Sequence, residues 1–254
     1  MDQTSLRDAL TLGAGLLDSR PAQALALAEK AARWAPDRPE PPTLAGRALL
    51  ALDRPTEALD RLRQALALAP GHAPAALAAG RLLRDAGRRE EAEGLLKAAL
   101  DEDLDAREPA ELLMAIQRER LDELLARSEM VERNFRPRDF LVTAMVSTYR
   151  SAEFMDECLA DLEKQTLADR LEIIVVDAAS PEPEGEIVAA WQEGHDNIRY
   201  VRTPKRIGIY EAWNLAVRLA SGRQAYQWVK LDDLPLRYSY LLTPEERSLP
   251  WATP

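Results

Sequence analysis

A spacing of 34 residues recurs through the first half of the chain and constrains its fold more than any other feature. Alanine, proline and glycine all repeat at this spacing: Ala24, Ala58 and Ala92; Ala31, Ala65 and Ala99; Pro36 and Pro70; Gly46 and Gly80. Small residues at fixed points let two short helices cross closely, and proline ends a helix before the next unit begins. The spacing therefore predicts an array of helix pairs that share one continuous core.

This array resembles tetratricopeptide repeats, with about three units over residues 5–38, 39–72 and 73–106. Ala28, Leu62 and Leu96 stand where the family usually has larger residues. A helical array needs a cap that covers its last unit. We expect residues 107–136 to form capping and linker helices, with an apolar face made by Leu112, Leu113, Ile116, Leu121, Leu124 and Leu125.

The resemblance also implies that the first helices of the units line a groove that binds a protein partner. The register places Arg47 and Arg81 at equivalent positions, and Arg84 lies one turn further along the same helix. Guanidinium groups bind carboxylates through charge-assisted hydrogen bonds. The predicted ligand is an acidic peptide or a free carboxylate, and ordinary solvated arginines are the alternative.

The second half of the chain, residues 137–233, contains hydrophobic runs that end at polar or acidic residues. LVTAMV precedes Ser147, Thr148 and Tyr149, LEIIVV precedes Asp177, and YQWVKL precedes Asp232 and Asp233. Helical patterns follow the earlier runs, as a βαβ sheet requires. Ligands of open α/β sheets bind just beyond the carboxyl ends of the strands. The pattern therefore predicts a binding site at this edge.

Residues 141–233 resemble the nucleotide-binding half of a family-2 glycosyltransferase with the GT-A fold. Five features occur in the family's order: the Thr148-Tyr149 turn, the pair Gln165-Thr166, Asp177 after a strand, a helix with Gly208, Ala212, Asn214 and Ala216, and the pair Asp232-Asp233. The predicted fold class is thus α plus α/β. A TPR-like α-solenoid over residues 1–106 precedes a partial Rossmann-like GT-A domain over residues 137–233.

The resemblance implies transfer of a sugar from a nucleotide diphosphate sugar to an acceptor hydroxyl. The residues expected to contact the nucleotide are Thr148, Tyr149, Asp177, Asn214 and Asp232. Asp177 would hold the base, Asp232 the ribose, and Asp233 a Mg²⁺ or Mn²⁺ ion that bridges the phosphates. The alternative for Asp177 is that it only caps the loop that follows it, because aspartate favours turns. Lys230, at the first position of the acidic motif, would pair with the carboxylates and weaken cation binding. Arg206 could reach the diphosphate, and the alternative is an exposed arginine without a partner.

Two departures from the family bear on activity. Ala178 and Ala179 stand where a second acid and a glycine are common. Residues 234–254 form an atypical tail with room for one short helix beginning at Thr243, and the strands that would carry the acceptor and a catalytic base are missing. We therefore expect a truncated domain that binds nucleotide weakly, does not turn over a donor, and self-associates through an exposed sheet edge. The alternative is a non-catalytic TPR scaffold with a vestigial nucleotide-binding domain.

Composition excludes several other classes of function. The net charge is −10, from 33 basic and 43 acidic residues, which argues against binding nucleic acid by phosphate neutralisation. No apolar run approaches the roughly 20 residues of a membrane span, and the polar N-terminus is not a signal peptide, so we expect a cytoplasmic protein. His72, His195 and Cys158 are too few and too scattered in sequence for a zinc-type site.

Overall fold

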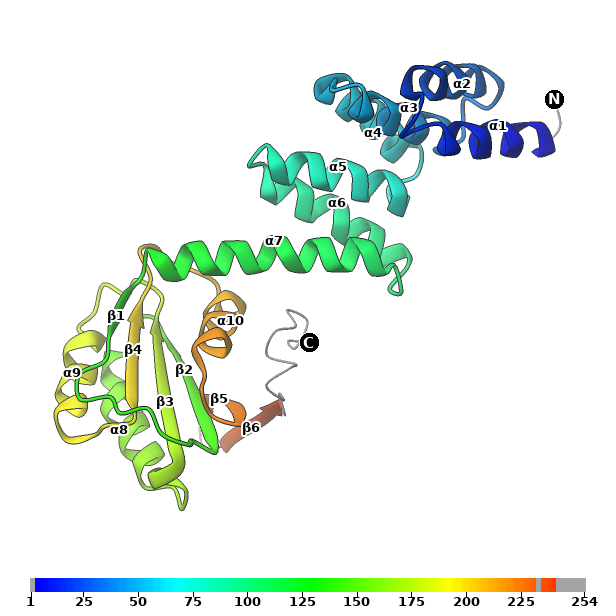
Figure 1. Cartoon of the computed structure of the whole chain (residues 1–254). Coiled ribbons are helices and arrows are strands. Elements are labelled where there is room, and N and C mark those ends of the chain that lie inside the picture. Colours follow the sequence, from blue (N-terminus) through cyan, green and yellow to red (C-terminus); the bar gives the residue numbers. More distant parts are fainter. Residues whose placement is uncertain (1–2, 232–233, 241–254) are drawn as a thin grey trace. The chain divides into compact units, whose positions relative to one another are not determined.

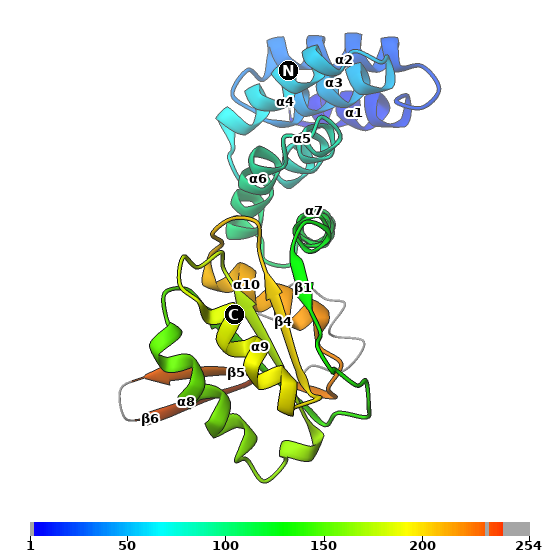
Figure 2. The same cartoon turned by 90° about the vertical axis from the view of Figure 1, so that its left-hand side faces the viewer.

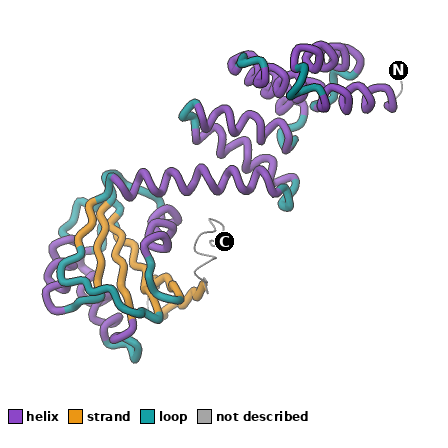
Figure 3. The backbone as a smooth tube through the Cα atoms, viewed as in Figure 1, coloured by secondary structure: helices purple, strands orange, loops and turns teal. Residues whose placement is uncertain are grey.

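The computed structural model describes residues 3–231 and 234–240, and the chain divides into two compact units, residues 1–116 and 117–254 (Figure 1). The first unit is helical and the second is built on a sheet (Figure 3). The combination of a repeat array with an α/β domain confirms the predicted fold class.

Three helix pairs make up most of the first unit. Their bounds are α1 Gln3–Gly15, α2 Pro21–Trp34, α3 Glu40–Ala51, α4 Pro55–Leu68, α5 Ala73–Asp85 and α6 Arg89–Glu102. The second helices of the pairs begin at residues 21, 55 and 89 and end at residues 34, 68 and 102. Both sets of bounds repeat at the 34-residue spacing of the sequence.

Small residues bring these helices together. The six repeated alanines of α2, α4 and α6 are all 0% exposed. At Gly46 of α3, an added Cβ atom would lie 2.6 Å from Leu62 Cγ of α4, so a larger side chain would clash there. The equivalent atom at Gly80 would lie 3.2 Å from the side chain of Leu96. The repeated glycines thus allow the close helix crossing that the spacing predicts.

A single helix, α7 (Arg107–Ala126), follows the repeats. Leu112 and Ile116 in its first half belong to the repeat core, whereas Leu124 in its second half belongs to a core of the sheet unit. The segment expected to form capping and linker helices also contains strand β1 (Glu129–Val131). Three residues are too short for a period-2 pattern, so this strand leaves no signal in the sequence.

The second unit contains a sheet with strand order β1-β4-β3-β2-β5-β6. The strands are β2 Val142–Thr148, β3 Leu171–Asp177, β4 Ile198–Arg202, β5 Gln224–Leu231 and β6 Leu234–Tyr240. Strands β4, β3, β2 and β5 run parallel, while β1 and β6 pair antiparallel with β4 and β5 (Figure 2). The parallel strands therefore direct their carboxyl ends to one edge.

Strand β6 corrects our expectation that residues 234–254 contain no strand. Residues 234–240 pair with β5 along their whole length, from Leu234 opposite Leu231 to Tyr240 opposite Ala225. The signal was the alternation of apolar and other residues in LPLRYSY, which is typical of a strand. The helix expected at Thr243 lies outside the described residues.

Helices cover both faces of the sheet. Helices α8 (Ala152–Glu163) and α9 (Glu184–Gly194) pack on one face, and α10 (Ile209–Leu219) packs on the other together with the second half of α7. Strand β3 is buried along its whole length because it contributes to both layers. Ile173 and Val175 contact the α8–α9 layer, whereas Ile174 and Val176 contact the α10 layer.

Candidate functional site

A cavity of about 570 Å³ lies at the carboxyl edge of the sheet. The loop after β2, the turn after β3 and the start of α10 contribute its lining residues, which are Ser147, Thr148, Tyr149, Ser151, Ala178, Arg206, Ile207, Gly208, Ile209 and Ala212. From β2 the chain moves to β3 and β4 on one side and returns to β5 on the other. The carboxyl edge of β2 is thus a topological switch point, where open α/β sheets bind ligands.

The residues predicted to contact a nucleotide occupy different environments. Thr148 and Tyr149 line the cavity. Asn214 is half-buried on α10 and is not among the lining residues. Asp232 and Asp233 lie outside the described residues, but β5, which precedes them, runs parallel to β2. Strand β5 therefore runs in the same direction as β2, and the two strands pair as far as Gln227 opposite Met145.

Asp177 is fully buried and bound to groups of its own chain. Its Oδ1 accepts a hydrogen bond from the Ser180 backbone N–H at 2.6 Å. Its Oδ2 accepts hydrogen bonds from the Tyr200 hydroxyl at 2.5 Å and from Arg202 Nη1 at 2.5 Å. Burial and the hydrogen bond to Asp177 raise the pKa of Tyr200 well above its usual value, so the phenol stays a neutral donor. Direct contact between Asp177 and a base would require some of these bonds to open.

Glu184 joins the loops that follow β2 and β3. This carboxylate is 0% exposed, and its Oε1 accepts hydrogen bonds from Ser180 Oγ at 2.7 Å, Ser151 N–H at 3.0 Å and Thr148 Oγ1 at 3.4 Å. Burial by itself raises the pKa of Glu184, but hydrogen bonds from Ser151, Ser180 and Thr148 and from its own backbone N–H hold the pKa below its usual value. The ionised carboxylate thus fixes Thr148 at the wall of the cavity.

Both loops contain a residue in the left-handed backbone region. Arg150 has φ 55° and Ala179 has φ 56°. Residues without a glycine's freedom adopt this region at a cost of roughly 1–2 kcal/mol, and such strain often accompanies binding sites. The Arg150 N–H donates to Ser180 Oγ at 2.9 Å, which helps to hold the strained turn.

Four further residues of this region were not predicted from the sequence: Ser180, Glu184, Tyr200 and Arg202. Arg202 lies directly opposite Asp177 in the β3–β4 register. Side chains alternate between the two faces of a strand, so the sequence alone predicts that Tyr200 and Arg202 of β4 lie on the same face. The pairing of that face with Asp177 depends on strand order, which the sequence does not state.

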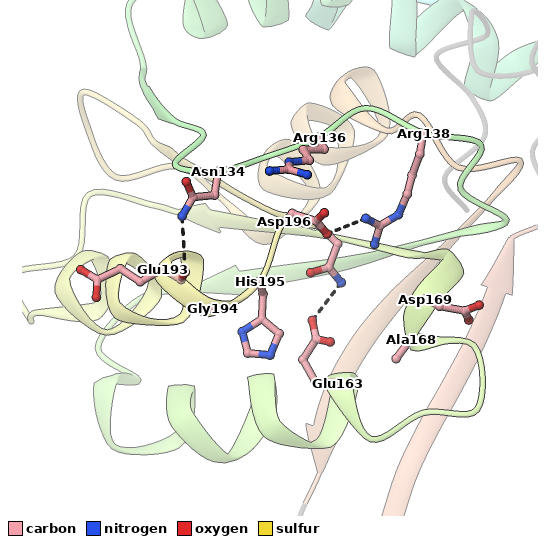
Figure 4. A pocket seen from close by; sticks show the side chains of 11 residues that line it. Asn134, Arg136, Arg138, Glu163, Ala168, Asp169, Glu193, Gly194, His195 and Asp196 are labelled. Atoms are coloured by element: carbon pink, nitrogen blue, oxygen red, sulfur yellow. Dashed lines mark hydrogen bonds and ion pairs between the residues drawn. The ribbon is translucent and has the colours of Figure 1, made fainter.

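A second cavity of about 620 Å³ lies at the opposite, amino edge of the sheet, beside the residues that precede β3 and β4 (Figure 4). Four of its polar side chains form two pairs. Arg138 Nη1 lies 2.5 Å from Asp196 Oδ1, and Asn197 Nδ2 donates to Glu163 Oε1 at 2.8 Å. These pairs hold the loops at this edge together.

No three histidine, cysteine, aspartate or glutamate side chains within residues 3–231 and 234–240 are grouped so that they could hold a metal ion. In the same part of the chain, no helix combines the length and apolar character that crossing a membrane requires.

Comparisons with protein families identify both units. Residues 143–233 match the family described as Glycosyl transferase family 2, and residues 49–116 match the family described as Tetratricopeptide repeat. The first match includes every lining residue of the 570 Å³ cavity.

Curated relatives are glycosyltransferases. Glycosyltransferase GlyG of Streptococcus pneumoniae is 29% identical over 82 residues, which are 32% of this chain and 27% of that protein. Uncharacterized glycosyltransferase EpsJ of Bacillus subtilis is 33% identical over 82 residues, which are 32% of this chain and 23% of that protein. The chain thus matches about a quarter of the length of each relative.

Two solved structures also resemble the chain. An O-GlcNAc transferase mutant from Thermobaculum terrenum is 16% identical, with a TM-score of 0.41, and the match covers 86% of this chain and 45% of that one. The mannosyltransferase PcManGT from Pyrobaculum calidifontis, in complex with GDP-Man and Mn²⁺, is 26% identical, with a TM-score of 0.33. This match covers 46% of this chain and 36% of that one. From the family matches, the chain carries a partial family-2 glycosyl transferase domain preceded by tetratricopeptide repeats.

Proposed function

We propose that the chain binds a nucleoside diphosphate sugar in the 570 Å³ cavity and takes part in glycosyl transfer. The observation that carries this proposal is the position of the cavity. It lies at the carboxyl edge of a parallel sheet, within the segment that matches the glycosyl transferase family. Thr148 offers a hydroxyl and Tyr149 an aromatic ring in its wall, and these groups suit a nucleoside.

In the proposed reaction, the acceptor hydroxyl loses its proton to a base as its oxygen forms a bond to the anomeric carbon of the sugar. The bond from that carbon to the phosphate oxygen breaks, and the nucleoside diphosphate leaves with the electron pair. The site must therefore stabilise negative charge on the leaving diphosphate.

A divalent cation fits the proposed site by its donor chemistry. Strand β5 runs parallel to β2, whose carboxyl end lines the cavity, and the sequence continues from β5 with Asp232 and Asp233. Carboxylate oxygens are the ligands that Mg²⁺ and Mn²⁺ prefer. When bound, such a cation would neutralise the diphosphate. Lys230, which also precedes these residues, would compete for the carboxylates and lower the affinity for the cation.

Calorimetry with uridine and guanosine diphosphates tests the nucleotide site. We expect Tyr149→Ala to weaken binding by about tenfold, because the variant removes an aromatic ring from the cavity wall and with it the apolar contact that the ring would make with the nucleoside. Tyr210→Ala is the matched control, since Tyr210 is 61% exposed on α10 and does not line the cavity. Failure of the unmodified chain to bind either nucleotide, or equal losses in both variants, would reject the proposal.

We also propose that the repeats bind an acidic partner segment through Arg47 of α3 and Arg81 of α5. Both side chains are exposed, and they occupy equivalent places in consecutive repeats. Arg81 already lies 3.5 Å from Glu108, but this pair is exposed on both sides and is easily exchanged. Arg84, the third residue of the predicted groove, is half-buried and interacts with groups of its own chain. The proposal therefore rests on the first two arginines.

A further inference from the structure

We propose that Arg150 and Arg206 form a clamp for the diphosphate of the ligand at the mouth of the 570 Å³ cavity. This inference rests on the proposed function and assigns a subsite within it. The two guanidinium groups would neutralise the leaving diphosphate, together with any cation that the acidic motif holds.

The two guanidinium groups lie beside the same aromatic ring. Arg206 Cζ is 4.3 Å from the centroid of the Tyr149 ring, and Arg150 Cζ is 5.6 Å from it. Tyr149 and Arg206 both line the cavity. Because arginine is attracted to the face of an aromatic ring, Tyr149 holds both positive charges beside the cavity wall. Arg206 is itself a lining residue, and Arg150 lies in the chain between the lining residues Tyr149 and Ser151.

Both arginines keep their hydrogen-bonding capacity for a ligand. Each is exposed, and within the described part of the chain neither forms an ion pair with a carboxylate. Arg202 of β4 differs in this respect, because its Nη1 donates to Asp177 and its Nη2 donates to the Ser180 carbonyl. A planar guanidinium can donate two parallel hydrogen bonds to a phosphate group.

Hydrogen bonds hold the backbone of Arg150 in one conformation. Its φ of 55° is unfavourable for arginine, yet its N–H is held by Ser180 Oγ, and that hydroxyl donates to the buried Glu184. Ser180 N–H is in turn bound to Asp177. Two buried carboxylates thus anchor the turn that carries Arg150, and strain maintained in this way is typical of binding sites.

The start of α10 adds to the positive potential at the same place. Ile207, Gly208 and Ile209 line the cavity, and Gly208 is the N-cap residue of the helix. A glycine has no side-chain acceptor for the first N–H groups of the helix, so these donors remain available to a ligand. Helix N-termini with free N–H groups favour phosphate. The arginine pair and the helix start therefore converge on one anionic ligand.

Titration calorimetry on the full chain tests the clamp with Arg150→Gln, Arg206→Gln and the double variant. The probes are uridine diphosphate, guanosine diphosphate, the two parent nucleosides and inorganic pyrophosphate. We expect each single variant to lose about tenfold or more in affinity for the diphosphates and for pyrophosphate, with nucleoside affinity unchanged. Arg170→Gln, an exposed arginine just before β3 at the opposite edge, is the control and should behave as the unmodified chain.

The outcomes separate the clamp from the proposed function. If the unmodified chain binds the diphosphates and the arginine variants bind them equally well, the clamp is wrong and the nucleotide site stands. If it binds pyrophosphate through these arginines but neither diphosphate nor nucleoside, the clamp stands and the nucleotide proposal is wrong. Absence of binding to all five probes overturns the clamp. Circular dichroism of each variant checks that the fold is retained.

Discussion

Asp177 illustrates how an acid at a strand end can bind groups of its own chain beside a proposed binding site. Acids at this edge are predicted to face a ligand, but the Asp177 carboxylate instead receives hydrogen bonds from Ser180, Tyr200 and Arg202. These bonds tie the end of β3 to β4 and to the turn that bears the strained Ala179. Asp177 therefore holds the loops beside the cavity in place. Thr148, which pairs with Asp177 in the β2–β3 register, and Tyr149 line the cavity itself.

The Asp177→Ala variant should therefore lose stability. Removing one partner of a fully buried ion pair costs about 3–5 kcal/mol, and the loss here should be smaller, about 2–3 kcal/mol, because the Arg202 side chain is 36% exposed. Urea denaturation measures the free energy of unfolding. Asp169→Ala, an exposed acid before β3, should change it by less than about 0.5 kcal/mol. Equal stability of the Asp177 variant and the unmodified chain would show that the buried pair contributes nothing net.

At the scale of elements, the repeat helices offer a test of close packing. Gly46→Ala would place a Cβ atom 2.6 Å from Leu62 Cγ and 3.2 Å from the Ala58 carbonyl oxygen. Overpacking of this kind costs about 1–3 kcal/mol, which exceeds or offsets the gain of about 1 kcal/mol from the better helix propensity of alanine.

Gly94→Ala is the matched control for this substitution. Gly94 lies inside α6, and nothing stands within 4 Å of an added Cβ atom. Propensity alone should then stabilise the helix by about 0.8–1 kcal/mol. Thermal denaturation should show the Gly46 variant melting below the Gly94 variant. The reverse order would mean that the α3–α4 crossing is looser than the structure indicates.

The two units differ in how far their elements could be predicted from the sequence. The helix pairs were predictable because the same local pattern occurs in each repeat. Alanine at three equivalent positions, Ala24, Ala58 and Ala92, is stronger evidence for the pattern than a single occurrence. Strands β2 and β3 were predictable from long apolar runs that end at polar residues. The partners of Asp177 were not, since Tyr200 and Arg202 lie 23 and 25 residues further along the chain and meet it only through the β3–β4 register.

At the scale of the whole molecule, the proposed peptide site and nucleotide site lie in separate compact units. Arg47 and Arg81 belong to residues 1–116, whereas Arg150 and Arg206 belong to residues 117–254. The net charge of −10 repels acidic ligands in general, so each site depends on its local arginines. Substitutions in one unit should then leave the ligand affinity of the other unit unchanged.

The double variant Arg47→Ala, Arg81→Ala should bind a fluorescein-labelled peptide of alternating glutamate and alanine roughly three- to tenfold more weakly, because exposed charge pairs contribute up to about 1 kcal/mol each. Fluorescence anisotropy measures this affinity. Arg63→Ala on α4, whose side chain pairs with Glu91 at 3.2 Å, is the control on a second helix. Nucleoside diphosphate affinity should stay constant in both variants, while Arg206→Gln should change only nucleotide affinity. If the repeat variant binds the peptide as well as the control does, the arginines are ordinary solvated residues and the partner of the repeats is recognised elsewhere.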